Sequence, residues 1–201
     1  MNTPNKLSLI RVLIIPVILF FLLPVQIFSF HPEKWNEFVA TNGRLIACFL
    51  FIGASITDYA DGKIARKYNM VTNLGKFLDA LADKMLVIAV LVAFVQMQRI
   101  SSAGVVIIIL RELMVSGVRM VASEKGVVIA ANTLGKIKTV TQMTAIIFIL
   151  LEPLLTFIFR YLGDSSAYIP FVGTLLFFIC VVMTIISGLD YLLKNLAFFK
   201  D

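Results

Sequence analysis

Long apolar segments alternate with short polar ones along the chain, and this pattern predicts helices that cross a membrane. Several apolar segments approach or exceed the roughly 20 residues that a helix needs to span a bilayer. The main polar interruptions read FHPEKWNEF, KYNMVTN and YLGDSSAYIP. We therefore expect six helices, at about 7–28, 41–67, 73–98, 101–123, 133–159 and 168–195. The chain is predicted to be an all-α, polytopic integral membrane protein with six transmembrane helices and a single domain over residues 1–201.

The composition agrees with this membrane class. Of the 201 residues, 60% are hydrophobic, and the formal net charge is +6. A transmembrane barrel would show short segments of alternating polarity instead. The first apolar segment contains Pro16 and Pro24 and lacks a small-residue cleavage site, so we expect a membrane helix there and no cleavable signal. Cys48 and Cys180 lie in apolar segments, where they are expected to be small buried side chains.

The distribution of Lys and Arg predicts the orientation in the membrane. With the N-terminus inside, one face receives Lys6, Arg11, Lys63, Arg66, Lys67, Lys76, Lys125, Lys136, Lys138, Lys194 and Lys200. The other face receives Lys34, Arg44, Arg99 and Arg160. Because basic residues collect on the cytoplasmic side, both termini should be cytoplasmic, with the protein in the inner (cytoplasmic) membrane.

Four aspartates stand at the cytoplasmic end of the second and third expected helices. Asp58 and Asp61 are three residues apart, and Asp79 and Asp83 are four apart, so each pair shares one helix face. At about 1.5 Å per residue, Asp58, Asp79 and Asp83 lie about 13, 10 and 16 Å from the ends of their helices. Two antiparallel helices joined by a short loop would place all of these carboxylates at similar depth.

Close carboxylates without a counter-charge would repel one another, and bound cations remove this repulsion. Ligands that are all oxygen favour Mg²⁺, Mn²⁺ or Ca²⁺, and four carboxylates suit a two-metal site for phosphoryl chemistry. Gly62 and Gly75 would let a ligand approach closely, and Arg66 is a suitable partner for phosphate. The alternatives are buried ion pairs, a cation transporter or channel that uses the aspartates, and a structural scaffold.

The spacing of these residues matches a known pattern. It reads Asp58-x2-Asp61-Gly62-x2-Ala65-Arg66-x8-Gly75-x3-Asp79-x3-Asp83. This resembles the signature of the CDP-alcohol phosphatidyltransferase family at every defining position. The resemblance extends to the chain length, the six helices and the N-terminal segment PNKLSLIR.

The resemblance implies that the hydroxyl of an acceptor alcohol attacks a phosphorus of a CDP-linked lipid such as CDP-diacylglycerol, and that CMP leaves. The family's roles would make Asp58, Asp61, Asp79 and Asp83 ligands of Mg²⁺ or Mn²⁺, and Asp83 the general base. Gly62, Ala65, Arg66 and Gly75 would bind the CDP moiety. The resemblance also implies a homodimer, and the expected partners are these substrates and the lipid bilayer, with no nucleic acid.

Basic residues in the fourth and fifth expected helices indicate a phosphorylated acceptor. Arg111 and Arg119 share one helix face, and Lys136 and Lys138 open the next helix. An arginine inside an apolar helix needs an anionic partner, and Glu112 leaves the helix about 100° away from Arg111. The segments RELMVSGVR and LGKIKTVTQ resemble those of bacterial family members that use sn-glycerol 3-phosphate, which is therefore the expected acceptor.

Other assignments stay open. Inositol phosphate would also account for the arginines, whereas the uncharged acceptors serine and diacylglycerol would leave them unexplained. Each of the cations could instead be a membrane anchor whose charge reaches the interface. Asn5, Ser8 and Arg11 recur at helical spacing, where they would contact the CDP-lipid or form the interfacial start of a helix.

Overall fold

The computed structural model describes residues 3–25, 32–67, 73–124, 126–127, 129, 132–162 and 166–195, without the side chains of residues 3–9, 58–81, 83 and 124. The elements in chain order are α1(Thr3–Leu22), α2(Glu33–Phe38), the π-helical segment η1(Val39–Gly43), α3(Arg44–Lys67), α4(Asn73–Gln96), α5(Ser102–Glu124), α6(Thr133–Tyr161) and α7(Tyr168–Lys194). Short turns and connections make up the rest of the described chain, and this confirms the all-α class.

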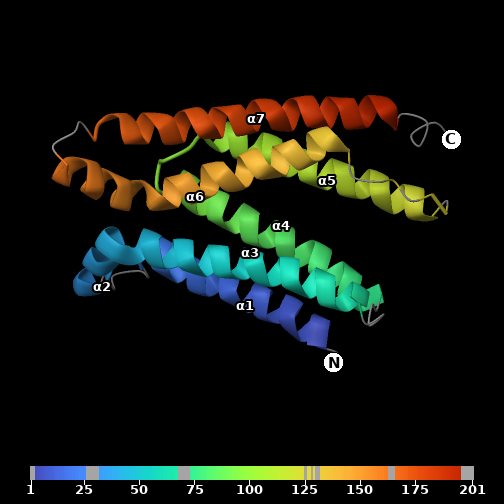
Figure 1. Ribbon diagram of the computed structural model, residues 1–201, viewed down its shortest axis with the longest axis horizontal. Coiled ribbons are helices and arrows are strands. Elements are labelled where there is room, and N and C mark those ends of the chain that lie inside the picture. The colour runs from blue at the N-terminus through green and yellow to red at the C-terminus, as the bar shows by residue number, and fades with distance from the viewer. Residues whose placement is uncertain are drawn as a thin grey trace.

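The long helices form two groups that share one core. Helices α1, α3 and α4 lie together, as do α5, α6 and α7, and contacts of α3 with α6 and of α4 with α5 join the groups (Figure 1). One cluster of buried apolar side chains takes members from all six long helices, among them Ile18, Phe51, Phe94, Ile108, Ile149 and Phe177. The two groups therefore belong to a single packed unit.

The first two predicted helices have different boundaries in the structure. Helix α1 ends at Leu22 instead of near residue 28, since a residue that precedes proline is driven out of the helical conformation and Pro24 follows closely. The segment FHPEKWNEF was expected to be a loop, but its residues 33–38 form α2. The other four helices, α4 to α7, begin and end within about two residues of their predicted ends, which is the usual uncertainty of helix boundaries.

Helix α2 is held against the end of α1 by side chains that the apolar pattern could not identify. The Asn36 side chain accepts a hydrogen bond from the Val25 N–H at 2.9 Å and donates one to the Val25 carbonyl at 3.2 Å. The Trp35 ring stacks on Phe20 with centroids 4.5 Å apart. A Cβ at Gly43 would overlap the Phe21 carbonyl oxygen, so η1 needs glycine where it meets α1. The second helix thus begins at Glu33 and runs through η1 into α3.

The described helices include three that are long and apolar enough to cross a membrane. They are Glu33–Thr57, Thr133–Tyr161 and Tyr168–Lys194, and shorter apolar stretches occur at Ile10–Leu22 and Lys84–Gln96. Length and composition alone give this result, which is consistent with a membrane protein. The expected burial of the two cysteines is confirmed, because Cys48 and Cys180 are 2% and 1% exposed.

The helix ends divide between the two ends of the bundle. The start of α1, the end of α3, the start of α4, the end of α5, the start of α6 and the end of α7 lie towards one end, the right-hand side of Figure 1. The aspartate positions and the start of α6 with its lysines belong to this end. Arg44, Arg99 and Arg160 lie towards the opposite end.

Candidate active site

The aspartate motif spans the end of α3 and the start of α4. The backbone places Asp58 and Asp61 in the last three turns of α3, and Asp79 and Asp83 in the first three turns of α4. Side chains outside the described part of the chain include these four and those of Asn5, Ser8, Gly62, Ala65, Arg66 and Gly75. Among the side chains that are described, no group of three or more His, Cys, Asp or Glu could hold a metal ion. The ligand set therefore stays a prediction.

A cavity of about 940 Å³ lies between α4, α5, α6 and α7, beside the aspartate-bearing start of α4. Its polar lining consists of Lys84, Arg111, Glu112, Ser116, Arg119, Asn132, Lys136, Thr139, Ser187 and Tyr191. Three of the four cations that the sequence singled out, Arg111, Arg119 and Lys136, meet here, although α5 and α6 supply them from different positions. Lys84 is a fourth cation, and it follows Asp83 directly in the sequence.

The charges around this cavity favour an anion. Among the described lining residues, four carry positive charge and Glu112 is the carboxylate. A cavity lined mostly by one sign of charge between apolar walls concentrates the field and raises the local concentration of the opposite ion. The Arg119 guanidinium lies 5.9 Å from the centroid of the Tyr191 ring, which fixes it at the cavity wall.

The side chain of Arg111 is held between two helices by small residues. Its Nη2 donates a hydrogen bond to Ser187 Oγ on α7 at 2.8 Å. A Cβ at Gly188 would lie 3.1 Å from Arg111 Cγ, and one at Gly135 would lie 3.4 Å from Nη2. Contacts that close leave little room for a larger side chain on either helix. Glycines on α6 and α7 therefore make a narrow slot through which Arg111 reaches the cavity.

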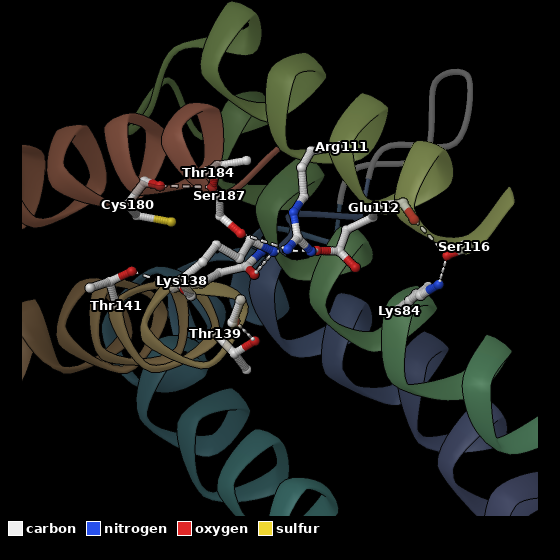
Figure 2. A network of polar contacts seen from close by, with 12 residues as sticks. Lys84, Arg111, Glu112, Ser116, Lys138, Thr139, Thr141, Cys180, Thr184 and Ser187 are labelled. Atoms are coloured by element: carbon white, nitrogen blue, oxygen red, sulfur yellow. Dashed lines mark hydrogen bonds and ion pairs between the residues drawn. The ribbon is translucent and has the colours of Figure 1, made fainter. Parts of the chain in front are cut away.

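Glu112 is an anionic partner of Arg111, and the expectation that its direction on the helix would keep the two charged groups apart was wrong. Arg111 Nη1 lies 3.0 Å from Glu112 Oε1, and the same oxygen accepts a hydrogen bond from Lys138 Nζ (Figure 2). The side chains leave α5 in different directions, but both are long enough to meet beside α6. The 100° offset fixes only the direction of the Cα–Cβ bonds.

Lys138 lies on a second, smaller cavity of about 290 Å³. Its other polar lining residues are Arg11, Ser55, Lys84, Glu112, Thr139 and Gln142. Lys138 is 1% exposed, and its ammonium also donates to Gln142 Oε1 at 2.6 Å. A lysine that extends its charge to the membrane surface would not be so buried, so the anchor alternative fails for Lys138. Arg11 is 2% exposed and lies on the same cavity.

Lys84, Glu112 and Thr139 line both cavities and so form the wall between them. Lys84 Nζ donates to Ser116 Oγ, whose hydroxyl donates to the Glu112 carbonyl at 2.6 Å (Figure 2). This contact ties the aspartate-bearing α4 to the arginine-bearing α5. Sequence reasoning gave no role to Lys84, although its place directly after the last aspartate of the motif was a usable signal.

Other residues of the site were missed because they lie far apart in the sequence. Asp190, to which the sequence assigned no role, accepts a hydrogen bond from the Asn132 side chain. It also forms an ion pair with Lys194, whose Nζ lies 2.8 Å from Asp190 Oδ1. The Asn132 side chain also caps α6 by accepting the Leu134 N–H at 2.5 Å. Asp190 thus holds the start of α6, and with it Lys136, beside α7.

A buried carboxylate lies at the opposite end of the bundle. Glu152 is 4% exposed, receives a hydrogen bond from Arg99 Nε at 2.7 Å, and lies 3.5 Å from Arg44 Nη1. Arg99 also donates to Thr174 Oγ1 at 2.9 Å. These contacts join the start of α3, the α4–α5 connection, α6 and α7. They are too far along the bundle to belong to the cation-lined cavities.

The chain belongs to the CDP-alcohol phosphatidyltransferase family, whose sequence pattern it matches over residues 1–186. The cation-transporter and scaffold alternatives are therefore replaced by a transferase family, as the aspartate motif indicated.

Curated relatives cover nearly the whole chain. A protein of Bacillus subtilis named CDP-diacylglycerol–glycerol-3-phosphate 3-phosphatidyltransferase is 39% identical over 199 residues, which covers 96% of this chain and 95% of the relative. Proteins of the same name are 35% identical in Rickettsia bellii, with 94% and 93% covered, and 33% identical in Shigella flexneri, with 95% and 93% covered.

Proposed function

We propose that this protein transfers the phosphatidyl group from CDP-diacylglycerol to sn-glycerol 3-phosphate, with release of CMP. The observation that carries the choice of acceptor is the cavity in which Arg111, Arg119, Lys136 and Lys84 surround a space large enough for a small phosphorylated polyol. The names of the three relatives agree with this acceptor. The product, phosphatidylglycerophosphate, would serve the synthesis of anionic phospholipids.

The aspartate motif would supply the reacting centre. Mg²⁺ or Mn²⁺ held by Asp58, Asp61, Asp79 and Asp83 would offset the charge of the diphosphate and of the departing CMP. Carboxylate oxygens are the donors that these ions prefer. Gly62, Ala65, Arg66 and Gly75 would bind the CDP moiety, with Asn5, Ser8 and Arg11 beside them. The burial of Arg11 on the smaller cavity supports a place near the lipid phosphates.

The chain's own side chains have separate tasks in the transfer. Arg111, Arg119 and Lys136 would hold the acceptor phosphate and so direct its hydroxyl towards the aspartates. The Asp83 carboxylate would take the hydroxyl proton as the new oxygen–phosphorus bond forms and the bond to CMP breaks. Lys138 was predicted as a fourth acceptor-binding residue, but its ammonium faces Glu112 and Gln142.

The proposal includes a topology. All six long helices would cross the inner membrane, and the end of the bundle that carries the motif would face the cytoplasm, with both termini on that side. Water-soluble glycerol 3-phosphate and CMP would then exchange with the cytoplasm while the diacylglycerol chains remain in the bilayer. Residues 1–201 would act as one domain, in a homodimer.

The test is CMP release by the purified protein with CDP-diacylglycerol, a divalent cation and one acceptor at a time. Glycerol 3-phosphate, inositol phosphate, serine and a reaction without acceptor would run in parallel. We expect release to depend on glycerol 3-phosphate and on Mg²⁺ or Mn²⁺. Release that requires a different acceptor would retain the transferase chemistry and overturn the assignment of the cation-lined cavity.

A further inference from the structure

Lys138 is separated from the other cations that the sequence grouped with it. Its side chain is 2% exposed, and the ammonium is engaged by Glu112 and by Gln142. It lines the smaller cavity, whereas Arg111, Arg119 and Lys136 line the larger one. Glu112 lines both cavities and accepts a hydrogen bond from the Lys138 ammonium. Direct binding of the acceptor therefore does not explain why this lysine is buried.

The contacts of Lys138 lead instead to Arg111. One continuous chain of polar contacts joins Gln142 and Lys138 on α6, Glu112 and Arg111 on α5, and Ser187 on α7. Figure 2 shows this chain from Lys138 to Ser187. Glu112 Oε1 is the shared atom, because it accepts from both cations. The guanidinium of Arg111 is thus fixed on one side by Glu112 and on the other by Ser187.

The charges explain why two cations share one carboxylate. Alone with Glu112, Arg111 would form a neutral pair with little attraction left for a phosphate. With Lys138 present, the three groups together keep one net positive charge. Glu112 is also held more firmly between two cations than in a single pair, because it keeps one ion-pair partner when the other is removed.

We propose that Glu112 and Lys138 are positioning residues, which together hold the Arg111 guanidinium towards the acceptor phosphate and preserve its positive charge. This inference rests on the proposed function, since it concerns the binding of glycerol 3-phosphate. Glu112 and Lys138 contact Arg111 or its partner and not the substrate. Their loss should weaken acceptor binding while the handling of CDP-diacylglycerol changes little.

Substitution of Glu112 separates positioning from simple electrostatics. Glu112→Gln removes a negative charge from the wall of an anion-binding cavity, so electrostatics alone would lower the KM for glycerol 3-phosphate. Loss of positioning would raise it, by about tenfold for one hydrogen bond to a charged group. A KM that falls or stays unchanged in a folded Glu112→Gln variant overturns the proposal.

A double-mutant cycle tests whether Lys138 acts through Glu112. We expect Lys138→Met to raise the acceptor KM, and the Glu112→Gln/Lys138→Met protein to show no more than the larger single effect. Lys136→Met is the matched control, because Lys136 is exposed and lines the larger cavity. The fold-increases in acceptor KM caused by Lys136→Met and Glu112→Gln should multiply in the double variant. Independent effects of Lys138→Met and Glu112→Gln would mean that Lys138 does not act through Glu112.

Ser187→Ala provides a milder variant in case the buried charge changes prevent folding. It removes the other hydrogen bond to Arg111, and it should raise the acceptor KM several-fold with no change for CDP-diacylglycerol. Thr184→Ala is its control, because Thr184 Oγ1 donates a hydrogen bond within α7, to the Cys180 carbonyl at 2.7 Å. Equal KM values in these two variants would show that Arg111 needs no fixed orientation. A wild-type protein that does not use glycerol 3-phosphate would overturn the proposed function instead.

Discussion

Arg111 Nη1 lies 3.0 Å from Glu112 Oε1, although the two residues are sequence neighbours whose side chains leave α5 in different directions. The pair is possible because both side chains extend past the helix surface to meet Lys138 from α6. A helical projection of the sequence separates these residues, and only the packing of α5 against α6 and α7 brings their charged groups together.

Arg119 should be needed for acceptor binding. It lines the larger cavity and stacks over the Tyr191 ring. Replacement by alanine removes a charge-assisted contact to phosphate, which is worth about 1.5–3 kcal/mol, so the KM for glycerol 3-phosphate should rise about tenfold to a hundredfold. Steady-state kinetics on both substrates would measure this. Arg160→Ala, an exposed arginine at the other end of the bundle, should leave both KM values unchanged.

Asp83→Asn should abolish turnover while much of the binding of CDP-diacylglycerol remains. The substitution keeps the size of the side chain but removes the proposed proton acceptor, and general-base catalysis typically contributes about a hundredfold to ten-thousandfold in rate. CMP release and binding of the CDP-lipid would be measured on the same preparation. Near-normal turnover would exclude Asp83 as the base.

Chelation should stop the reaction and leave the fold in place. Excess EDTA would remove the divalent ions that the aspartates are proposed to hold, so CMP release should fall to background. Addition of Mg²⁺ or Mn²⁺ beyond the chelator should restore it. Thermal unfolding of the treated protein provides the control for structural damage. Full activity in the presence of EDTA would contradict the two-metal proposal.

Glu152→Gln should lower stability without an effect on substrate binding. The buried carboxylate holds Arg99 and Arg44, and breaking a buried ion pair by removing one partner costs about 3–5 kcal/mol. The melting temperature in detergent should therefore fall clearly. Glu33→Gln changes an exposed residue of α2 and should leave the melting temperature unchanged. Similar melting temperatures for the two variants would mean that the Glu152 cluster contributes little.

Gly173→Ala should damage the same cluster by overlap. A Cβ at this position would collide with Glu152 Oε1 and lie 2.8 Å from Arg99 Nη2, so the ion pair would have to move. Gly53→Ala is the matched helical control, because no described atom beyond its chain neighbours and the nearby backbone of α3 lies within 4 Å of its added Cβ. That control should be neutral or stabilising by up to about 1 kcal/mol, the helix-propensity gain of alanine over glycine. A melting temperature for Gly173→Ala that equals that of Gly53→Ala would contradict the predicted collision.

The sequence determined where the long helices lie and which family the chain belongs to. Four of the six predicted helices have ends within about two residues of those observed. The apolar segments and the polar breaks between them were enough for this, because burial of apolar side chains largely determines where a helix forms. The aspartate motif identified the family, because all of its residues lie within one short segment and their spacing can be read directly from the sequence. The extent of α2 was not predicted, because Asn36 and Trp35 stabilise it through contacts with α1.

Only the tertiary structure decided which charges meet. Periodicity assigns a side chain to a face of its own helix, but it does not say which residue of a neighbouring helix lies opposite. Lys136 and Lys138 are two residues apart, yet one lines the cation-rich cavity and the other is buried against Glu112. Glu152 likewise finds Arg44 across 108 positions of sequence. The packing of helices determines such partners, because a buried charge must be paired wherever the neighbouring helix allows it.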